Sequence, residues 1–221
     1  METELLQQRA TVFAALGDPI RLAVAEALLL GDRTPASLSA EFGVPSNLMA
    51  HHSGILVDAG VVRRHPSERD RRRTYMQLTA TGAETLRPNA IPAHRVVFVC
   101  THNSARSQFA EALWRDHSDV PVESGGTHPA ARVNPMARKA AQRRGLSLRG
   151  ATPKQLSPGA VGGALLVTVC DSADEELLNT PHLHWSVPDP VGRPQSAFLD
   201  AFDTIKDRVE RLSYVVTLEE S

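Results

Sequence analysis

The chain has 221 residues, of which 42% are hydrophobic, and a formal net charge of −1. This is the composition of a globular protein that buries a core, in one large domain or two small ones. Only Cys100 and Cys170 are present, which excludes a disulfide framework and a Cys-rich zinc site. No apolar run approaches the length of a spanning helix, and Glu2 and Glu4 stand where a signal peptide would be basic. We therefore expect a cytoplasmic protein with no membrane partner.

The first part of the chain reads as short helices followed by a hairpin. Apolar periodicity, bounded by glycines and by Asp or Thr before proline, predicts helices over residues 5–16, 20–30, 35–42 and 46–59. Ser46 is expected to cap the last of these helices. Residues 61–65 and 74–78 can pair as a hairpin with a polar tip at residues 66–73. Together they predict a winged helix-turn-helix of the α+β class over residues 1–87.

The segments LGDPIRLAVAEALL, LSAEFGVPSNLMAHHSGILVDAGVVRR and RRRTYMQLTATG resemble the ArsR-type winged-helix regulators, over nearly all of residues 5–87. The resemblance implies a homodimer on double-stranded DNA, with residues 46–58 in the major groove and the hairpin on backbone or minor groove. The candidates for contacts with base edges are Ser46, Asn47, His51 and His52. The candidates for contacts with phosphates are Arg63, Arg64, Arg71, Arg72 and Arg73. The alternative is a solvated arginine-rich loop on a generic dimerisation module.

This N-terminal part lacks the metal ligands that some regulators use. Arsenite-sensing members of the family carry paired cysteines near the recognition helix, whereas residues 1–99 contain none. The domain therefore cannot trap arsenite through thiolates of its own. The adjacent His51 and His52 point about 100° apart on a helix, so we expect no metal site there either.

The second part of the chain reads as strands alternating with helices. Two prolines within residues 87–93 forbid a continuous helix, so we expect a linker over residues 88–93 and a second domain over residues 94–221. Apolar runs at residues 95–99 and 165–169 predict buried strands of a parallel sheet. Residues 184–187 are also strand-like, and residues 108–117 and 195–213 read as helices.

A cysteine-containing loop follows the first of these strands. Cys100 ends the strand, and the loop Thr101, His102, Asn103, Ser104, Ala105 and Arg106 leads through Ser107 into a helix. Such a loop aims backbone N–H groups at an anion. These groups and Arg106 would stabilise the Cys100 thiolate and make it a nucleophile, while Arg106 grips a tetrahedral oxyanion. Ser107 could donate a hydrogen bond to Cys100, and Asn103 tolerates a left-handed backbone. The alternative is a buried core thiol.

A proton donor is needed for the leaving oxygen, and Asp189 is the candidate. Asp189-Pro190 follows the last strand-like segment, where loops of an alternating fold return to the carboxyl edge of the sheet. Taken alone, Asp-Pro is also a common turn dipeptide. Together with the cysteine loop, it favours a general acid.

VVFVCTHNSARSQFAEAL and WSVPDPVG resemble the low-molecular-weight tyrosine phosphatases and the arsenate reductases built on their fold, over roughly residues 94–213. The resemblance implies an α/β domain with a four-stranded parallel sheet flanked by helices. It also implies Cys100 as nucleophile, Arg106 as oxyanion clamp and Asp189 as general acid. Ser107-Gln108 in place of the phosphatases' Ser-Pro, and the lack of tyrosines after Asp189-Pro190, favour the reductases.

The same resemblance implies an ion site. Asn103, Glu111 and Ser124 match positions that hold potassium in some reductases. Gln155 stands where that site would have an acidic residue, and His102 stands where a small residue is common. These two positions are departures from the family pattern.

The resemblance also gives the second thiol a role. In the strand order that it implies, Cys170 lies beside Cys100, so it either attacks a Cys100-arsenate adduct to form a disulfide or is simply a small buried hydrophobe. No further cysteine follows Cys170. We therefore expect a low-molecular-weight thiol with a glutaredoxin-like partner, rather than thioredoxin, as the external reductant, and no tightly bound cofactor.

The sequence thus predicts a bifunctional chain, an ArsR-like transcriptional regulator fused to an arsenate reductase in arsenic resistance. Two alternatives stay open. One is a phosphatase acting on phosphorylated proteins, fused to a regulator. The other is a non-enzymatic regulator whose Cys100 loop only senses an oxyanion such as arsenate or phosphate.

Overall fold

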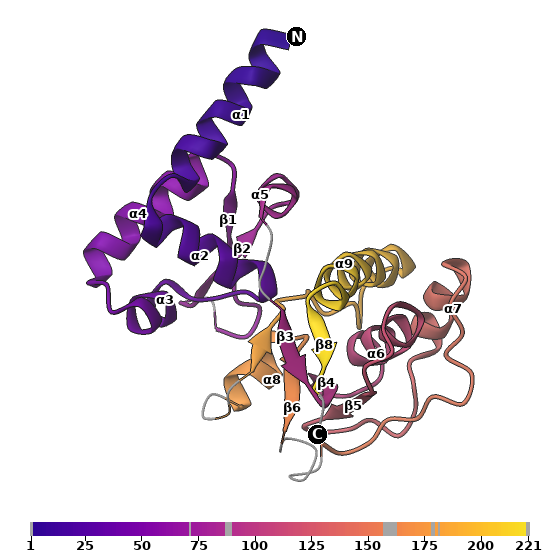
Figure 1. The fold of residues 1–221 in the computed structure, drawn as a ribbon. Coiled ribbons are helices and arrows are strands. Elements are labelled where there is room, and N and C mark those ends of the chain that lie inside the picture. Colours follow the sequence, from indigo (N-terminus) through magenta and orange to yellow (C-terminus); the bar gives the residue numbers. More distant parts are fainter. Residues whose placement is uncertain are drawn as a thin grey trace. The chain divides into compact units, whose positions relative to one another are not determined.

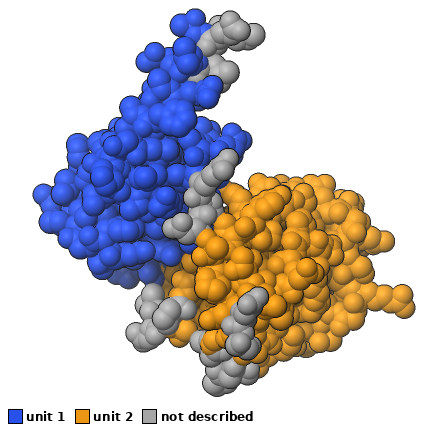
Figure 2. All heavy atoms as spheres, in the orientation of Figure 1, with its two compact units in different colours: residues 1–88 blue, residues 89–221 orange. Residues whose placement is uncertain are grey.

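A computed structural model describes residues 2–70, 72–86, 90–156, 163–177, 180 and 182–219 (Figure 1). The chain divides into two compact units, residues 1–88 and residues 89–221, coloured separately in Figure 2. In the described ranges, no helix combines the length and the apolar character needed to cross a bilayer.

Unit 1 consists of helices followed by a hairpin and one more helix. Its elements are α1 (Glu2–Leu16), α2 (Pro19–Leu30), α3 (Pro35–Phe42), α4 (Ser46–Asp58), β1 (Val62–Pro66), β2 (Thr74–Leu78) and α5 (Ala80–Thr85). Strands β1 and β2 pair antiparallel. The bounds lie close to the predicted ranges, except that the short helix α5 was not predicted.

Local side-chain caps fix where the helices of unit 1 begin. Asp18 accepts a hydrogen bond from the Arg21 backbone N–H at 3.0 Å, and Pro19 follows in the first helical position. Thr34 and Ser37 form a reciprocal capping box at the start of α3. The prediction that Ser46 caps α4 is wrong. Pro45 is the residue before the helix, and Ser46 is already helical, because the extended backbone of Pro45 turns the chain into the helix directly.

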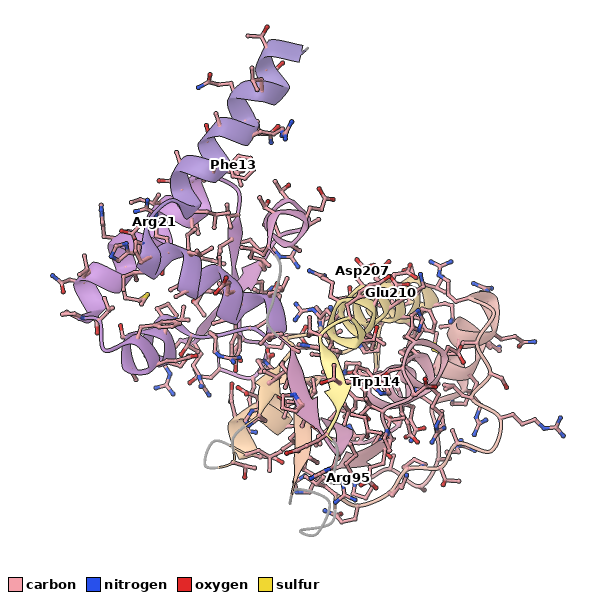
Figure 3. The ribbon with its side chains drawn as sticks, viewed as in Figure 1. Phe13, Arg21, Arg95, Trp114, Asp207 and Glu210 are labelled. Carbon is pink, nitrogen blue, oxygen red and sulfur yellow. The ribbon has the colours of Figure 1, made fainter. Side chains whose placement is uncertain are left out.

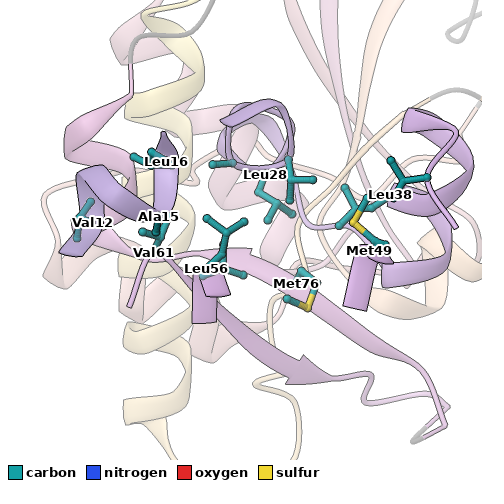
Figure 4. Packing of buried hydrophobic residues seen from close by; sticks show 13 residues of the cluster. Val12, Ala15, Leu16, Leu28, Leu38, Met49, Leu56, Val61 and Met76 are labelled. Carbon is teal, nitrogen blue, oxygen red and sulfur yellow. The ribbon is translucent and has the colours of Figure 1, made fainter. Parts of the chain in front are cut away.

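The core of unit 1 fixes the inner face of α4. Met49 and Leu56 of α4 are fully buried against Leu28 of α2, Leu38 of α3 and Met76 of β2 (Figure 4). Removing a buried leucine side chain of this kind costs about 2–5 kcal/mol. The α3–turn–α4 pair is therefore held rigidly by its apolar side, and the opposite side of α4 remains in solvent.

Unit 2 is an α/β domain. Its elements are β3 (Ile91–Ala93), β4 (Arg95–Cys100), α6 (Arg106–His117), β5 (Val122–Gly126), α7 (Pro135–Arg143), β6 (Ala164–Thr168), α8 (Asp171–Glu176), β7 (Leu183–His184), α9 (Gln195–Ser213) and β8 (Val216–Leu218). A four-stranded sheet has the order β5-β4-β6-β7 with every pair parallel, which confirms the predicted sheet. In Figure 1, α6 and α9 lie on one side of this sheet and α8 on the other.

Three expected boundaries of unit 2 need correction. The helix after the cysteine loop begins at Arg106 rather than at residue 108. The last strand covers Leu183–His184 rather than residues 184–187. Residues 91–93, placed in the linker, form β3, which pairs in parallel with β8 from Ile91–Val216 to Ala93–Leu218. Pro92 has no backbone N–H to donate. The β3–β8 sheet is instead hydrogen-bonded through its neighbours, the Ile91 N–H and the Ala93 carbonyl.

Aromatic packing anchors the strand that carries Cys100. The Phe98 ring lies 5.9 Å from the Trp114 ring of α6 and 5.6 Å from the Trp185 ring. The Trp114 indole, labelled in Figure 3, donates a hydrogen bond to the Val120 carbonyl at 2.9 Å. All three rings are almost completely buried. This packing fixes the end of β4 relative to the start of α6, where the cysteine loop lies.

Candidate active site

Cys100 lies at the carboxyl end of the central strand β4, directly before α6. Its side chain is buried, and its sulfur accepts a hydrogen bond from the Asn103 backbone N–H at 3.2 Å. The Ser107 hydroxyl lies 3.0 Å from the same sulfur. Asn103 has φ 47°, so the predicted left-handed residue is confirmed. The loop therefore turns tightly around the sulfur at the N-terminus of α6, where the helix dipole is positive.

The Asn103 side chain holds the loop in this shape. Its Oδ1 accepts hydrogen bonds from the Lys154 backbone N–H at 2.9 Å and from Gln108 Nε2 at 3.0 Å. Because a backbone N–H can only donate, these contacts fix the orientation of the amide. Nδ2 then donates to Ser107 Oγ and Ser124 Oγ, both at 2.8 Å. The amide thus connects Ser107, the hydroxyl partner of Cys100, to strand β5.

Gly126 permits the close approach of β5 to the loop. A Cβ atom at this position would lie 2.8 Å from the Thr101 carbonyl oxygen and 3.1 Å from Asn103. The backbone then continues beside the loop, where the His128 N–H donates to the Thr101 carbonyl at 2.8 Å. This contact was not predicted from the sequence, although the Gly125-Gly126 pair was its visible signal.

Arg106 and Asp189 meet across the carboxyl edge of the sheet. The Arg106 guanidinium is buried, with Nη1 donating to the Val187 carbonyl at 2.7 Å and Nη2 lying 3.2 Å from Asp189 Oδ2. The Asp189 side chain is 41% exposed, and its Oδ1 accepts from the Val191 N–H at 3.1 Å. The loop after β7 therefore brings an accessible carboxyl to the arginine that starts α6, as a proton donor in this site requires.

Cys170 is the second thiol at this edge. It follows β6, the neighbour of β4, and its sulfur lies 3.5 Å from the Thr101 hydroxyl in the cysteine loop. Burial raises the pKa of the Cys170 thiol, and the nearby Arg106 opposes this rise only in part. Cys170 is therefore protonated in the resting protein at neutral pH.

A buried cluster of histidines and carboxylates holds α8 beside Cys170. His182 Nε2 lies 2.7 Å from Asp174 Oδ1, and His184 Nε2 lies 3.3 Å from Asp171 Oδ1. His184 Nδ1 also lies 2.8 Å from the Thr168 hydroxyl. The sequence interpretation missed this cluster, because its residues come from two strand ends and a six-residue helix. It ties the helix that follows Cys170 to β6 and β7.

The remaining loop residues contribute main-chain contacts. The carbonyl groups of His102 and Ser104 accept from the backbone N–H groups of Ala130 and Asn134 at 3.0 and 2.9 Å. The His102 side chain is exposed, whereas Ala105 is buried directly before α6. Whether the loop amides from Thr101 to Arg106 bind an oxyanion stays a prediction.

The candidate DNA-contacting residues belong to unit 1, whereas the cysteine loop belongs to unit 2. Ser46, Asn47 and His51 are exposed on α4. His52 is only 8% exposed, and its Nδ1 lies 3.7 Å from Asp18 Oδ1, so it cannot read a base edge and that expectation is corrected.

The arginines of the hairpin differ in their surroundings. Arg63 and Arg64 are exposed on β1, and Arg63 donates to Gln77 Oε1 at 3.0 Å. Arg72 is bound to the Asp70 carboxylate, and Arg73 lies over the Tyr75 ring. Arg71 lies outside the described residues.

The side chains expected to hold potassium do not fit that ion. Both oxygen atoms of the Glu111 carboxylate are engaged, one by the Ser124 hydroxyl and the other by Arg115. The Asn103 oxygen is used by Lys154 and Gln108, so its NH₂ group faces Ser124. Gln155 directs its amide to the Thr127 carbonyl. A guanidinium already neutralises the carboxylate that the ion would need.

A buried thiol at a helix N-terminus, with an arginine and an accessible carboxyl paired at the same sheet edge, is the arrangement of a cysteine-dependent enzyme. Comparison with known families gives the same class. The family described as "Low molecular weight phosphotyrosine protein phosphatase" matches residues 95–221, and the chain belongs to this family. An "Arsenate reductase" of Bacillus cereus (strain 03BB102) is 34% identical over 127 residues, which is 54% of this chain and 94% of that relative.

Solved structures share the fold of unit 2. The tyrosine phosphatase Wzb from Escherichia coli K30, in complex with sulphate, aligns with a TM-score of 0.51 at 19% identity, covering 55% of this chain and 97% of that chain. The YwlE arginine phosphatase from Geobacillus stearothermophilus aligns with a TM-score of 0.50 at 20% identity, covering 55% and 91%. At these identities the likeness shows the fold alone.

Proposed function

We propose that unit 2 reduces arsenate to arsenite with Cys100 as nucleophile, and that unit 1 is an ArsR-like regulator that binds DNA. The observation that carries the first part is the placement of Cys100, Arg106 and Asp189 at the same carboxyl edge of the sheet. The Cys100 sulfur is held by Asn103 and Ser107, and Arg106, at the start of α6, pairs with Asp189. The 34% identity to relatives named arsenate reductase supports arsenate as the substrate.

The chemistry needs two thiols. The Cys100 thiolate attacks As(V), an arsenic–oxygen bond breaks, and that oxygen leaves as water with a proton from Asp189. Cys170, after losing its proton, attacks the Cys100 sulfur. The sulfur–arsenic bond breaks, its electron pair stays on arsenic, and arsenite leaves as a Cys100–Cys170 disulfide forms. An external thiol, such as glutathione with a glutaredoxin-like protein or thioredoxin, then reduces the disulfide.

The family membership also supports a phosphatase as the second candidate. Arg106 and Asp189 would serve phosphoryl transfer equally well, because phosphate and arsenate are both tetrahedral oxyanions. The two functions differ in their need for electrons. A phosphatase hydrolyses p-nitrophenyl phosphate at full rate without a thiol reductant, whereas arsenate reduction stops after one turnover unless a reductant is supplied.

The resolving role of Cys170 leads to a prediction about pH. Because burial raises the pKa of this thiol, its thiolate fraction keeps increasing as the pH rises through the neutral range and towards the raised pKa. In a single turnover without added thiol, we expect arsenite release to accelerate with pH through the neutral range. The release rate should level off only at a pH above 9.0, the ordinary pKa of a cysteine thiol. Rapid quenching followed by mass spectrometry should detect the Cys100–Cys170 disulfide at the same rate.

Cys170→Ser is the matched control for this prediction. It should still hydrolyse p-nitrophenyl phosphate, since the loop around Cys100 is intact, but release no arsenite without an external thiol. A rate of release that does not change with pH, or a wild-type product without the disulfide, would remove Cys170 from the reaction.

The architecture of unit 1 supports its proposed role as a DNA-binding regulator. Helices α3 and α4 are joined by a short turn and followed by the hairpin β1–β2, the arrangement of a winged helix-turn-helix. Apolar side chains of α1 are exposed, Leu6 by 65% and Phe13 by 56%, and Figure 3 labels Phe13. Their exposure supports a homodimer formed through unit 1.

DNA binding by unit 1 should depend strongly on salt. Each arginine that contacts a phosphate contributes about 0.9 to the slope of log affinity against log salt. We expect Arg64→Ala and Arg72→Ala to lower that slope by about this amount each and to weaken binding to all sequences alike. This slope is measured by fluorescence anisotropy on duplex DNA of random sequence across a series of salt concentrations. Arg149→Ala in unit 2 is the control, and equal slopes in all variants would argue against a DNA-binding hairpin.

A further inference from the structure

We propose that Arg115, one helical turn after Glu111 on α6, is a positioning residue for Cys100. In this proposal its guanidinium is a built-in cation that neutralises Glu111 and thereby keeps the hydrogen-bonded support of the cysteine loop in place. The proposal rests on the function proposed for Cys100 and goes beyond it, because Arg115 touches neither the sulfur nor the oxyanion.

A continuous line of contacts connects Arg115 with the nucleophile. Arg115 forms an ion pair with Glu111 one helical turn earlier, and the second oxygen of Glu111 accepts from the Ser124 hydroxyl. Ser124 accepts from Asn103 Nδ2 at 2.8 Å, and the same amide donates to Ser107 Oγ, which lies 3.0 Å from the Cys100 sulfur. The Ser124 hydroxyl accepts from Asn103 and donates to Glu111, so its direction is fixed on both sides.

The charge on Glu111 makes the line dependent on a cation. The Glu111 side chain is 7% exposed, whereas the Arg115 side chain is 60% exposed. An ion pair between two exposed residues contributes little, but a buried carboxylate that loses its partner is strongly disfavoured. Without Arg115, we expect the uncompensated Glu111 carboxylate to turn towards water. Ser124 then loses its acceptor, and its hydroxyl no longer holds a fixed position for the Asn103 NH₂ group.

A cavity of about 330 Å³ borders this line of contacts. Its lining includes Glu111, Arg115, Gln108, Thr152 and Lys154, so it joins the ion pair to groups that hold Asn103. A small cation from solvent can therefore reach Glu111 when the arginine side chain has been shortened. This access makes chemical rescue a direct test of the proposed role.

The test replaces Arg115 with methionine in the full-length protein. Two quantities report on the loop whatever the substrate is, the alkylation rate of Cys100 by iodoacetamide and the phosphate concentration that halves it. Both are read by mass spectrometry of the Cys100 peptide. We expect Arg115→Met to need on the order of tenfold more phosphate, as when other groups that orient a binding group are lost. Guanidinium chloride or potassium chloride at low concentration should restore the protection, and sodium chloride at equal ionic strength should not.

Four variants make the outcome specific. Arg115→Lys should keep most of the protection, since it keeps the cation. Glu111→Gln should abolish the response to guanidinium, and adding Arg115→Met to it should have no further effect. Lys206→Met removes a comparable i,i+4 ion pair, with Glu210 on α9, and should leave Cys100 unchanged. Circular dichroism confirms that each variant is folded.

The result that overturns the proposal is Arg115→Met with wild-type phosphate protection, which would make the ion pair a surface contact only. Loss of protection that no cation restores, with a lowered melting temperature, would equally overturn it, because the residue would then be merely structural. If wild-type Cys100 itself shows no phosphate protection, the failure lies with the proposed function and not with Arg115.

Discussion

Replacing Cys100 with serine is expected to abolish both arsenate reduction and the hydrolysis of p-nitrophenyl phosphate, by roughly 10⁴-fold or more. A serine hydroxyl stays protonated at neutral pH, although Asn103 and Ser107 would still surround it. It would also be unable to form the disulfide with Cys170. Steady-state kinetics with each substrate, and with reductant in excess, measure the loss.

A binding measurement and a comparison variant separate lost chemistry from lost structure. Isothermal titration should show that Cys100→Ser binds phosphate with an affinity within a few-fold of the wild type, because the loop amides and Arg106 remain. Cys170→Ser serves as the comparison, since it removes a thiol at the same edge but leaves hydrolysis intact. Substantial residual turnover in Cys100→Ser would contradict the assignment of the nucleophile.

The second large effect is expected for Arg106→Lys. Arg106 contacts the Val187 carbonyl and the Asp189 carboxylate through two different nitrogen atoms, and its planar fork can also hold two oxyanion oxygens. Lysine keeps the charge but supplies a single ammonium group, so we expect kcat to fall by about 10²–10³-fold. The hydrolysis of p-nitrophenyl phosphate and arsenate-dependent oxidation of the reductant should fall together.

The control for Arg106→Lys is Arg144→Lys. Arg144 pairs through two nitrogen atoms with Asp203 on the surface, so it presents the same fork without a place in the site. Its replacement should leave both activities unchanged. If lysine at position 106 retained wild-type kcat, charge alone would suffice, and the two-oxygen clamp would be wrong.

Much of the site could be predicted because its parts are close in the sequence. Cys100, Asn103, Arg106 and Ser107 fall within eight residues between a buried apolar strand and a helix, and that local pattern determines their geometry. Asp189 was harder, because its dipeptide is also a common turn. Its position after the last strand of an alternating fold brought it correctly to the same sheet edge.

The parts that could not be predicted depend on tertiary contacts. Strand β5 ends in two glycines, which have low strand propensity, and the strand exists because β4 beside it supplies hydrogen bonds. The burial of His52 was also not predicted. Histidine occurs on both buried and exposed faces of amphipathic helices, so the hydrophobic pattern does not decide which way it points. The short helix α5 carries Gly82 in its middle, where Val61 packs too closely for any side chain.

The pairing of β3 with β8 bears on how unit 2 can be separated from unit 1. Ile91 and Val216 are opposite each other, and the Glu219 N–H donates to the Ala93 carbonyl at 3.2 Å. A shortened protein that starts at Arg95, where the family match begins, would leave Val216 without its neighbour and the tail after α9 untethered. Dissection of the chain into independent halves should therefore cut ahead of Ile91.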